Sequence, residues 1–162
     1  MSIELPSIRD ICEPRDDVRK GVGDRFTANL NQVINNNGPD VYKDPALFFE
    51  NTHPTEGLIE TVYEVFSRLT KKGVGTSVIK LETSLGGGKT HTLIALYHLA
   101  KHGSSITQKS TILKGLDFSP INVAAVVGTD VQSTIWGDIA RKLKGNVGYK
   151  IIKEQEPQKQ AS

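Results

Sequence analysis

The feature that most constrains this chain is a glycine-rich stretch at residues 81–92, which reads LETSLGGGKTHT. A short run with β-branched residues, 77–81, comes before it, and an apolar run with helical spacing, 93–100, follows it and ends at Gly103. A strand, a glycine loop, Gly-Lys-Thr and a helix, in that order, form the context of a phosphate-binding loop. The sequence therefore predicts such a loop, here called the glycine loop (residues 84–88), between a strand and a helix.

The residue types of this stretch suit phosphate chemistry. Glycines let the backbone wrap closely around phosphate oxygens, and the loop N–H groups and the following helix N-terminus attract anions. Lys89 would reach the β- and γ-phosphates, Thr90 would hold Mg²⁺, and the backbone N–H of His91 would touch a phosphate. The predicted nucleotide-binding residues are Ser84, Leu85, Gly86, Gly87, Gly88, Lys89, Thr90 and His91, with Thr90 as the metal ligand.

One position departs from the usual pattern. Thr83 stands where G-x-x-x-x-G-K-[ST] has its first glycine. The additional glycines at Gly86 and Gly87 supply the flexibility that the first glycine normally gives. The alternative interpretation is a glycine-rich turn before an ordinary helix.

Composition places limits on the rest. With 162 residues there is room for one domain with a real core. The net charge of +2 argues neither for nor against nucleic acid, because no basic stripe stands out in the sequence. Cys12 is the single cysteine and is interpreted as a structural thiol. A single cysteine excludes an internal disulfide and fits a reducing cytoplasm. No apolar run approaches the ~20 residues of a membrane span, so no membrane partner is expected.

The first half reads as helical. Residues 1–23 form an irregular arm with one helical turn, and helices are expected at 24–36 and from Thr55 to Leu69. Either Thr52 or Thr55 is expected to cap the second of these helices. Asp44 followed by Pro45 is a helix-start signal. The aromatic pair that follows, Phe48 and Phe49, is interpreted as part of the core, with contact to a nucleotide base as the alternative. His53 is interpreted as a structural or exposed histidine.

The second half contains the other predicted strand, residues 121–127, which is almost continuously apolar. Joined to the first strand by a helix, it makes a βαβ unit. The predicted fold is therefore α/β, a P-loop NTPase-like partial parallel sheet flanked by helices, with an N-terminal helical arm. Asp130 after this strand is a candidate second Mg²⁺ ligand, but Val131 stands where an acid usually follows, and a strand-end or site-lining role is favoured.

A last helix is expected at 133–143 with Trp136 as a core anchor, then a strand at 149–152 and a frayed polar tail. The predicted layout is a helical segment at 1–72, an incomplete nucleotide-binding core at 73–152 and the tail at 153–162. His91 and His98 are seven residues apart, which does not match a zinc-binding helix.

Several segments together resemble one family. They are Asp44–Phe49, Thr52–Leu58, Leu81–His91, Leu96–Ala100, Val127–Asp130 and Trp136–Gly137. The chain is similar over about residues 10–150 to the prokaryotic ATPases catalogued as domain of unknown function 499, a family that tolerates threonine at the position of Thr83. The resemblance implies an AAA+-like ATPase, longer than this chain and often encoded beside DNA-modifying enzymes in phage-defence clusters. It also implies that the acid pair, sensors and arginine finger lie beyond residue 162, so that this chain corresponds to an N-terminal part.

Three hypotheses follow from the sequence. The leading one is a cytoplasmic domain that binds ATP with Mg²⁺ and has little or no turnover alone, related to DNA only through the family. A small phosphotransferase is less favoured, because its lid would need arginines and Arg141 is the single arginine after Asp130. The third is a non-catalytic interaction domain with an incomplete nucleotide site, which associates with itself or with other subunits.

Overall fold

The computed structural model describes residues 7–14, 16–19, 27–70, 76–82, 84, 86–106, 116, 121–128 and 134–155. Within these ranges the regular secondary structure is helical throughout. The helices are α1 (Ile8–Ile11), α2 (Asp16–Arg19), α3 (Leu30–Ile34), α4 (Asp40–Lys43), α5 (Pro45–Glu50), α6 (Glu56–Leu69), α7 (Lys89–Ile106) and α8 (Ile135–Gln155).

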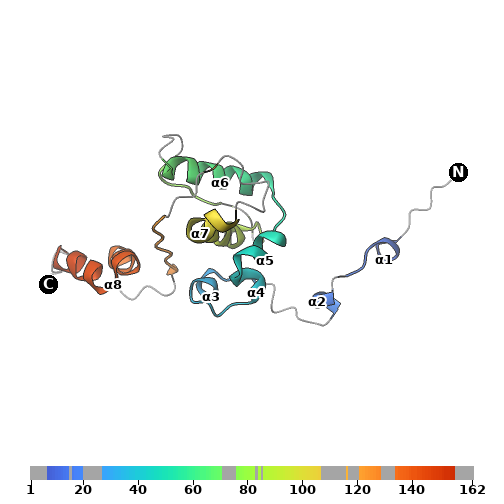
Figure 1. The fold of residues 1–162 in the computed structure, drawn as a ribbon, viewed down its shortest axis with the longest axis horizontal. Coiled ribbons are helices and arrows are strands. Elements are labelled where there is room, and N and C mark those ends of the chain that lie inside the picture. Colours follow the sequence, from blue (N-terminus) through green and yellow to red (C-terminus); the bar gives the residue numbers. More distant parts are fainter. Residues whose placement is uncertain are drawn as a thin grey trace.

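Helix α7 is the centre of the molecule. It packs against α3, α5 and α6, while α4 packs against α3 and α5 (Figure 1). The single turns α1 and α2 lie apart from this group on the N-terminal side, and α8 lies on the other side (Figure 1). The five helices α3 to α7, here called the central cluster, therefore hold the main packing of the described chain.

Local signals place the helix starts. Asp44 caps α5 by accepting hydrogen bonds at Oδ1 from the N–H groups of Ala46 and Leu47, at 2.8 and 2.9 Å, and Pro45 occupies the first position, as expected. Thr55, one of the two expected caps, caps α6 through the Leu58 N–H. Of the helix expected at 24–36, residues 24–26 lie outside the described residues, 27–29 are irregular, and α3 begins at Leu30 with Asn29 as its cap.

The core gathers apolar side chains from both sides of the glycine loop. On α6, Leu58, Val62 and Phe66 are buried at four-residue spacing, and Phe66 is 0% exposed. Burying one such side chain stabilises a fold by about 1.5–3 kcal/mol. Among the described residues, the buried apolar ones are Val33, Phe48, Leu58, Val62, Phe66, Ile94, Ala95, Leu99 and Ile106.

The predicted parallel sheet is wrong for the described residues. The expected strand 77–81 lies within an irregular described segment, 76–82, and the expected strand 121–127 is also irregular. Val78 is 80% exposed, which a residue inside a covered sheet would not be. A strand persists only when neighbouring strands satisfy its N–H and C=O groups, and a pair of strands alone is marginal. The apolar pattern indicated two segments that could become strands but could not supply their partners.

The last element also differs from expectation. Residues 149–152, expected as a strand, continue α8 after a bend at Lys144 and Gly145, where Gly145 has φ 62° and ψ −152°. The bend brings the two halves of α8 together so closely that a Cβ at Gly148 would lie 2.5 Å from the carbonyl oxygen of Ala140. Glycines at the bend and at the contact therefore allow the helix to resume rather than end.

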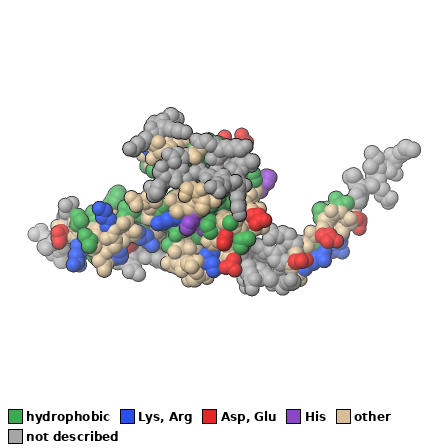
Figure 2. Space-filling model, in the orientation of Figure 1, with side chains coloured by type: hydrophobic (Ala, Val, Ile, Leu, Met, Phe, Trp, Pro, Cys, Tyr) green, Lys and Arg blue, Asp and Glu red, His purple; other side chains and the backbone are tan. Residues whose placement is uncertain are grey.

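Trp136, expected as a core anchor, is 71% exposed. Figure 2 shows hydrophobic side chains on the surface at the α8 end, and the exposed ones on this helix are Ile135, Trp136, Leu143, Val147 and Ile151. The first part of the expected tail, 153–155, belongs to α8, and 156–162 lie outside the described residues. None of the described helices is both long and apolar enough to cross a bilayer.

Candidate functional site

The glycine loop has a backbone that only glycine adopts easily. Gly86 and Gly88 have φ values of 82° and 77°, and no atom lies within 4 Å of a Cβ built at either position. A side chain at these positions would be strained by the backbone rather than by neighbours. The loop leads directly into α7, whose first residue is Lys89. The positive N-terminal end of an 18-residue helix therefore begins immediately after the two left-handed glycines.

Two hydrogen bonds close the loop on itself. The carbonyl oxygen of Ser84 accepts the N–H of Gly87 at 3.1 Å and the Nζ of Lys89, also at 3.1 Å. The carbonyl oxygen of Gly88 accepts the Thr92 N–H at 2.9 Å, which starts the helical ladder. Lys89 is thus held over the loop by a backbone carbonyl, a contact that a stronger acceptor such as phosphate can replace.

A cavity of about 540 Å³ lies beside this loop. That volume is within the usual size of a small-molecule site. One wall is made by Gly86–Lys89 with the irregular segment before them, and the other by the start of α6. The lining residues are His53, Thr55, Gly57, Leu58, Thr61, Lys80, Leu81, Glu82, Gly86, Gly87, Gly88, Lys89, His91 and Thr92.

The predicted site residues are only partly brought together. Gly86, Gly87, Gly88, Lys89 and His91 line the cavity, whereas Ser84 and Thr90 are not among its lining residues. Thr90 is half-buried in the first turn of α7, and Thr92 lines the cavity two residues later. The role of Thr90 as a Mg²⁺ ligand stays a prediction. Leu85, Thr83 and Asp130 lie outside the described residues.

The charges around the cavity favour an anion. Two lysines line it, Lys80 and Lys89, against one carboxylate, Glu82. Glu82 forms an ion pair with Lys80, and both side chains are mostly exposed. Lys89 and the helix N-terminus remain as the net positive features, and both lie at the glycine loop.

His91 joins the first turn of α7 to the end of α5. The Oγ1 hydroxyl of Thr52 donates to the carbonyl oxygen of Phe48 at 2.6 Å, so its oxygen accepts the Nε2–H of His91 at 2.9 Å. The imidazole also lies 4.5 Å from the Phe48 ring, at an interplanar angle of 31°. Burial lowers the pKa of His91. A neutral ring therefore holds the segment after α5 against the start of the glycine-loop helix.

His98, two turns further along α7, is 2% exposed. Its Nε2–H donates to the carbonyl oxygen of Tyr42 at 2.7 Å, and its Nδ1 is buried without a hydrogen-bond partner. Burial lowers the pKa of His98, with a smaller lowering from His102, while the bond to Tyr42 and the charge of Asp44 oppose this. The described residues contain no group of three or more His, Cys, Asp or Glu residues that could hold a metal ion.

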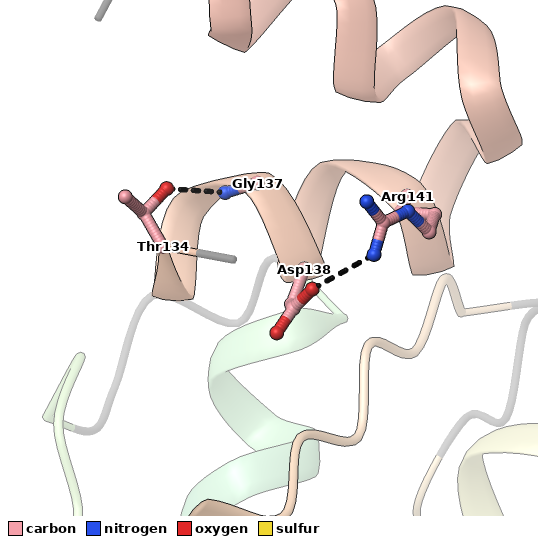
Figure 3. Close-up of polar contacts among 4 residues, drawn as sticks. All are labelled: Thr134, Gly137, Asp138 and Arg141. Carbon is pink, nitrogen blue, oxygen red and sulfur yellow. Dashed lines mark hydrogen bonds and ion pairs between the residues drawn. The ribbon is translucent and has the colours of Figure 1, made fainter. Parts of the chain in front are cut away.

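Sequence reasoning did not single out Asp138, which is 7% exposed at the start of α8. Its Oδ1 accepts from the Arg141 guanidinium at 3.1 Å, and the Thr134 hydroxyl oxygen accepts the Gly137 N–H at 3.2 Å (Figure 3). The Arg141 guanidinium also lies 4.1 Å from the Tyr149 ring centroid. The contact of Arg141 with Tyr149 joins the two halves of α8, whereas the other two contacts lie before the bend. None of these residues lines the cavity.

The comparison with protein families identifies the chain. The family model described as the DUF499 N-terminal domain matches residues 8–122, well over half of the 162 residues. The chain therefore belongs to this family, and the match includes the central cluster and the whole glycine loop. Neither the search of curated proteins nor that of solved structures gave a match.

Proposed function

We propose that this chain binds ATP with Mg²⁺ at the glycine loop. The observation that carries the proposal is the pair of positive-φ glycines, Gly86 and Gly88, placed directly before Lys89 at the start of α7. This arrangement presents backbone N–H groups, a helix N-terminus and an ammonium group to the same cavity, which together suit a polyphosphate.

The cavity suits binding better than hydrolysis. Turnover of a nucleoside triphosphate needs an acid that completes the Mg²⁺ site and a residue that orients the attacking water. Among the described residues that line the cavity, the single carboxylate is Glu82, and it is paired with Lys80. We infer that the chain alone turns ATP over slowly or not at all. Steady release of phosphate by the purified chain would contradict this part of the proposal.

Membership of the family, and its resemblance to DNA-related ATPases, support a wider role. In a larger phage-defence-type assembly, ATP binding here would drive a change of conformation that other parts of the machine use. This role rests on the family resemblance, and it requires that ATP binds at the glycine loop. The nucleotide site is therefore tested first.

The test is calorimetric titration of Mg²⁺–ATP into the wild-type chain, Lys89→Ala and Lys80→Ala. Loss of a charged phosphate contact costs about 1.5–3 kcal/mol, so Lys89→Ala should weaken binding at least about tenfold. Lys80→Ala removes the same charge from the same cavity, but from a lysine already paired with Glu82, and should weaken binding less than about threefold. Equal losses in the two variants, or no binding by wild type, would overturn the proposal.

A second candidate function is self-association through α8. It is favoured by the large exposed apolar side chains of this helix, Trp136 at 71% and Val147 at 68% exposure. Sedimentation over a wide concentration range tests it. A mass that rises with concentration in wild type and not in Trp136→Ala supports this function, and a monomer at all concentrations rejects it.

A further inference from the structure

Two helix N-termini meet at the same cavity. The start of α7 contributes Gly88 and Lys89, and the start of α6 contributes Thr55, Gly57 and Leu58. These segments are about 30 residues apart in the sequence, and the structure alone brings them to one site. The α6 wall, defined as His53, Thr55, Gly57, Leu58 and Thr61, faces the glycine loop across the cavity.

The two helix starts differ in their charge. The first turn of α7 contains no acidic residue and begins with Lys89. The first turn of α6 contains Glu56, and the hydroxyl of its cap Thr55 already accepts the Leu58 N–H. A carboxylate in the first turn offsets the positive end of the helix. The α7 end is therefore suited to an anion, and the α6 end to an uncharged group.

The α6 wall has the chemistry of a surface for an uncharged, partly polar group. Leu58 is buried and apolar, and Thr61 presents a hydroxyl oxygen. That hydroxyl donates its hydrogen to the carbonyl oxygen of Gly57 at 2.7 Å, so its oxygen retains lone pairs that can accept from a ligand N–H or O–H. A surface that combines an apolar side chain with a few placed polar groups suits a nucleoside.

Gly57 leaves the space open. A Cβ built at this position meets no atom within 4 Å. Gly57 and Thr61 are one turn apart on the same face of α6, and both line the cavity. The wall is also held in place, because Thr52 just before it is bonded to His91 in the first turn of α7. The structure thus combines a fixed wall with an unfilled surface at Gly57.

We propose that the base and ribose of the bound nucleotide lie against the α6 wall, with Gly57 providing the space and Thr61 a polar contact. This inference rests on the proposed ATP binding at the glycine loop. The phosphates bind at the start of α7, and the nucleoside extends across the cavity to the start of α6. The α6 wall is then the part of the chain that distinguishes a nucleotide from a simple polyphosphate.

The experiment compares two ligands, Mg²⁺–ATP and Mg²⁺–tripolyphosphate, by calorimetry. Tripolyphosphate has the phosphate chain without the nucleoside, so wild type should bind ATP at least about tenfold more tightly. Gly57→Leu places a side chain on the cavity face of α6 and should weaken ATP at least about tenfold while changing tripolyphosphate less than about twofold. The open space at Gly57 allows this variant to fold, which circular dichroism checks.

The matched control is Glu60→Leu, which puts the same side chain at an exposed α6 position outside the cavity lining. It should leave the preference for ATP over tripolyphosphate as in wild type. If wild type binds the two ligands equally, or if Gly57→Leu weakens both alike or neither, the nucleoside does not lie on the α6 wall. If wild type binds neither ligand, the proposed function itself fails.

Discussion

Helices α6 and α8 each carry apolar residues at helical spacing, but the structure treats them differently. On α6, Leu58, Val62 and Phe66 are buried in the core with residues of α7. On α8, Ile135 and Trp136 are 60% and 71% exposed, and no residue of the helix belongs to the core cluster of the described chain. Periodicity thus identifies the apolar face of a helix, whereas burial depends on a partner surface elsewhere in the chain.

The sharpest test of this difference removes one large side chain from each helix. Phe66→Ala deletes a ring that is 0% exposed and should lower the free energy of unfolding by about 3–5 kcal/mol. Trp136→Ala deletes a ring that is 71% exposed and should change it by about 0.5 kcal/mol or less. Urea unfolding followed by circular dichroism measures both. A loss in Trp136→Ala comparable to that in Phe66→Ala would show that the α8 face is covered in solution.

A smaller effect is expected at the bend of α8. Gly145→Ala forces a side chain into a backbone region, φ 62° and ψ −152°, that is essentially restricted to glycine, at a cost of about 1–3 kcal/mol. Because α8 lies outside the core, the cost should appear as faster hydrogen exchange of amides 146–155, with the α6 amides unchanged. Gly57→Ala, where a Cβ meets open space within α6, is the control and should leave the exchange of the α8 amides unchanged. Loss of protection in α6 on Gly145→Ala would mean that the two helices unfold together.

The smallest expected effect is a pH dependence confined to the central cluster. Burial lowers the pKa of His98 below its ordinary value of 6.5, so the unfolded chain binds the proton more readily than the folded chain. Stability is therefore full above about pH 6.5 and falls as the pH drops below it, by at most about 1.4 kcal/mol per pH unit for this histidine. The unpartnered Nδ1 explains the direction, because a proton there would find no acceptor.

Urea midpoints at about pH 7.5 and pH 5.5 measure this dependence in wild type and in His98→Gln, which keeps a donor near Tyr42 but does not titrate. The fall of the urea midpoint on acidification should be smaller in the variant. Part of the fall should persist, because the pKa of His91 is also lowered by burial. The same fall in both proteins would exclude His98 as a source. If acidification instead speeds hydrogen exchange of the α8 amides alone, the titrating group lies outside the central cluster.

The caps and the glycine loop could be predicted from the sequence because their contacts are local. Asp44 and Thr55 each bond to a backbone N–H two or three residues ahead. The positive φ of Gly86 and Gly88 is likewise permitted locally, by the absence of a Cβ. Even so, residues 27–29 of the helix expected at 24–36 are irregular and α3 starts at Leu30, since the apolar spacing did not identify Asn29 as the cap.

The site could be predicted only in part. The glycine loop was predicted by its motif. The α6 wall was not, because no local signal places Gly57 or Thr61 opposite Lys89. The bond from His91 to Thr52 spans 39 positions and could not be found from spacing. The predictions of a parallel sheet and of a buried Trp136 were wrong for a related reason, because both required partner surfaces that an apolar pattern cannot supply.

The sequence by itself determined where α5 and α6 begin, where the backbone turns left-handed before α7, and which face of each long helix is apolar. These features depend on hydrogen bonds and torsion angles within a few residues. The tertiary structure decided that α6 is buried while α8 is exposed, that segments 77–81 and 121–127 remain irregular, and that the start of α6 faces the glycine loop. Those outcomes depend on surfaces contributed by residues far apart in the chain, because burial and backbone pairing are complete only when both partners are present.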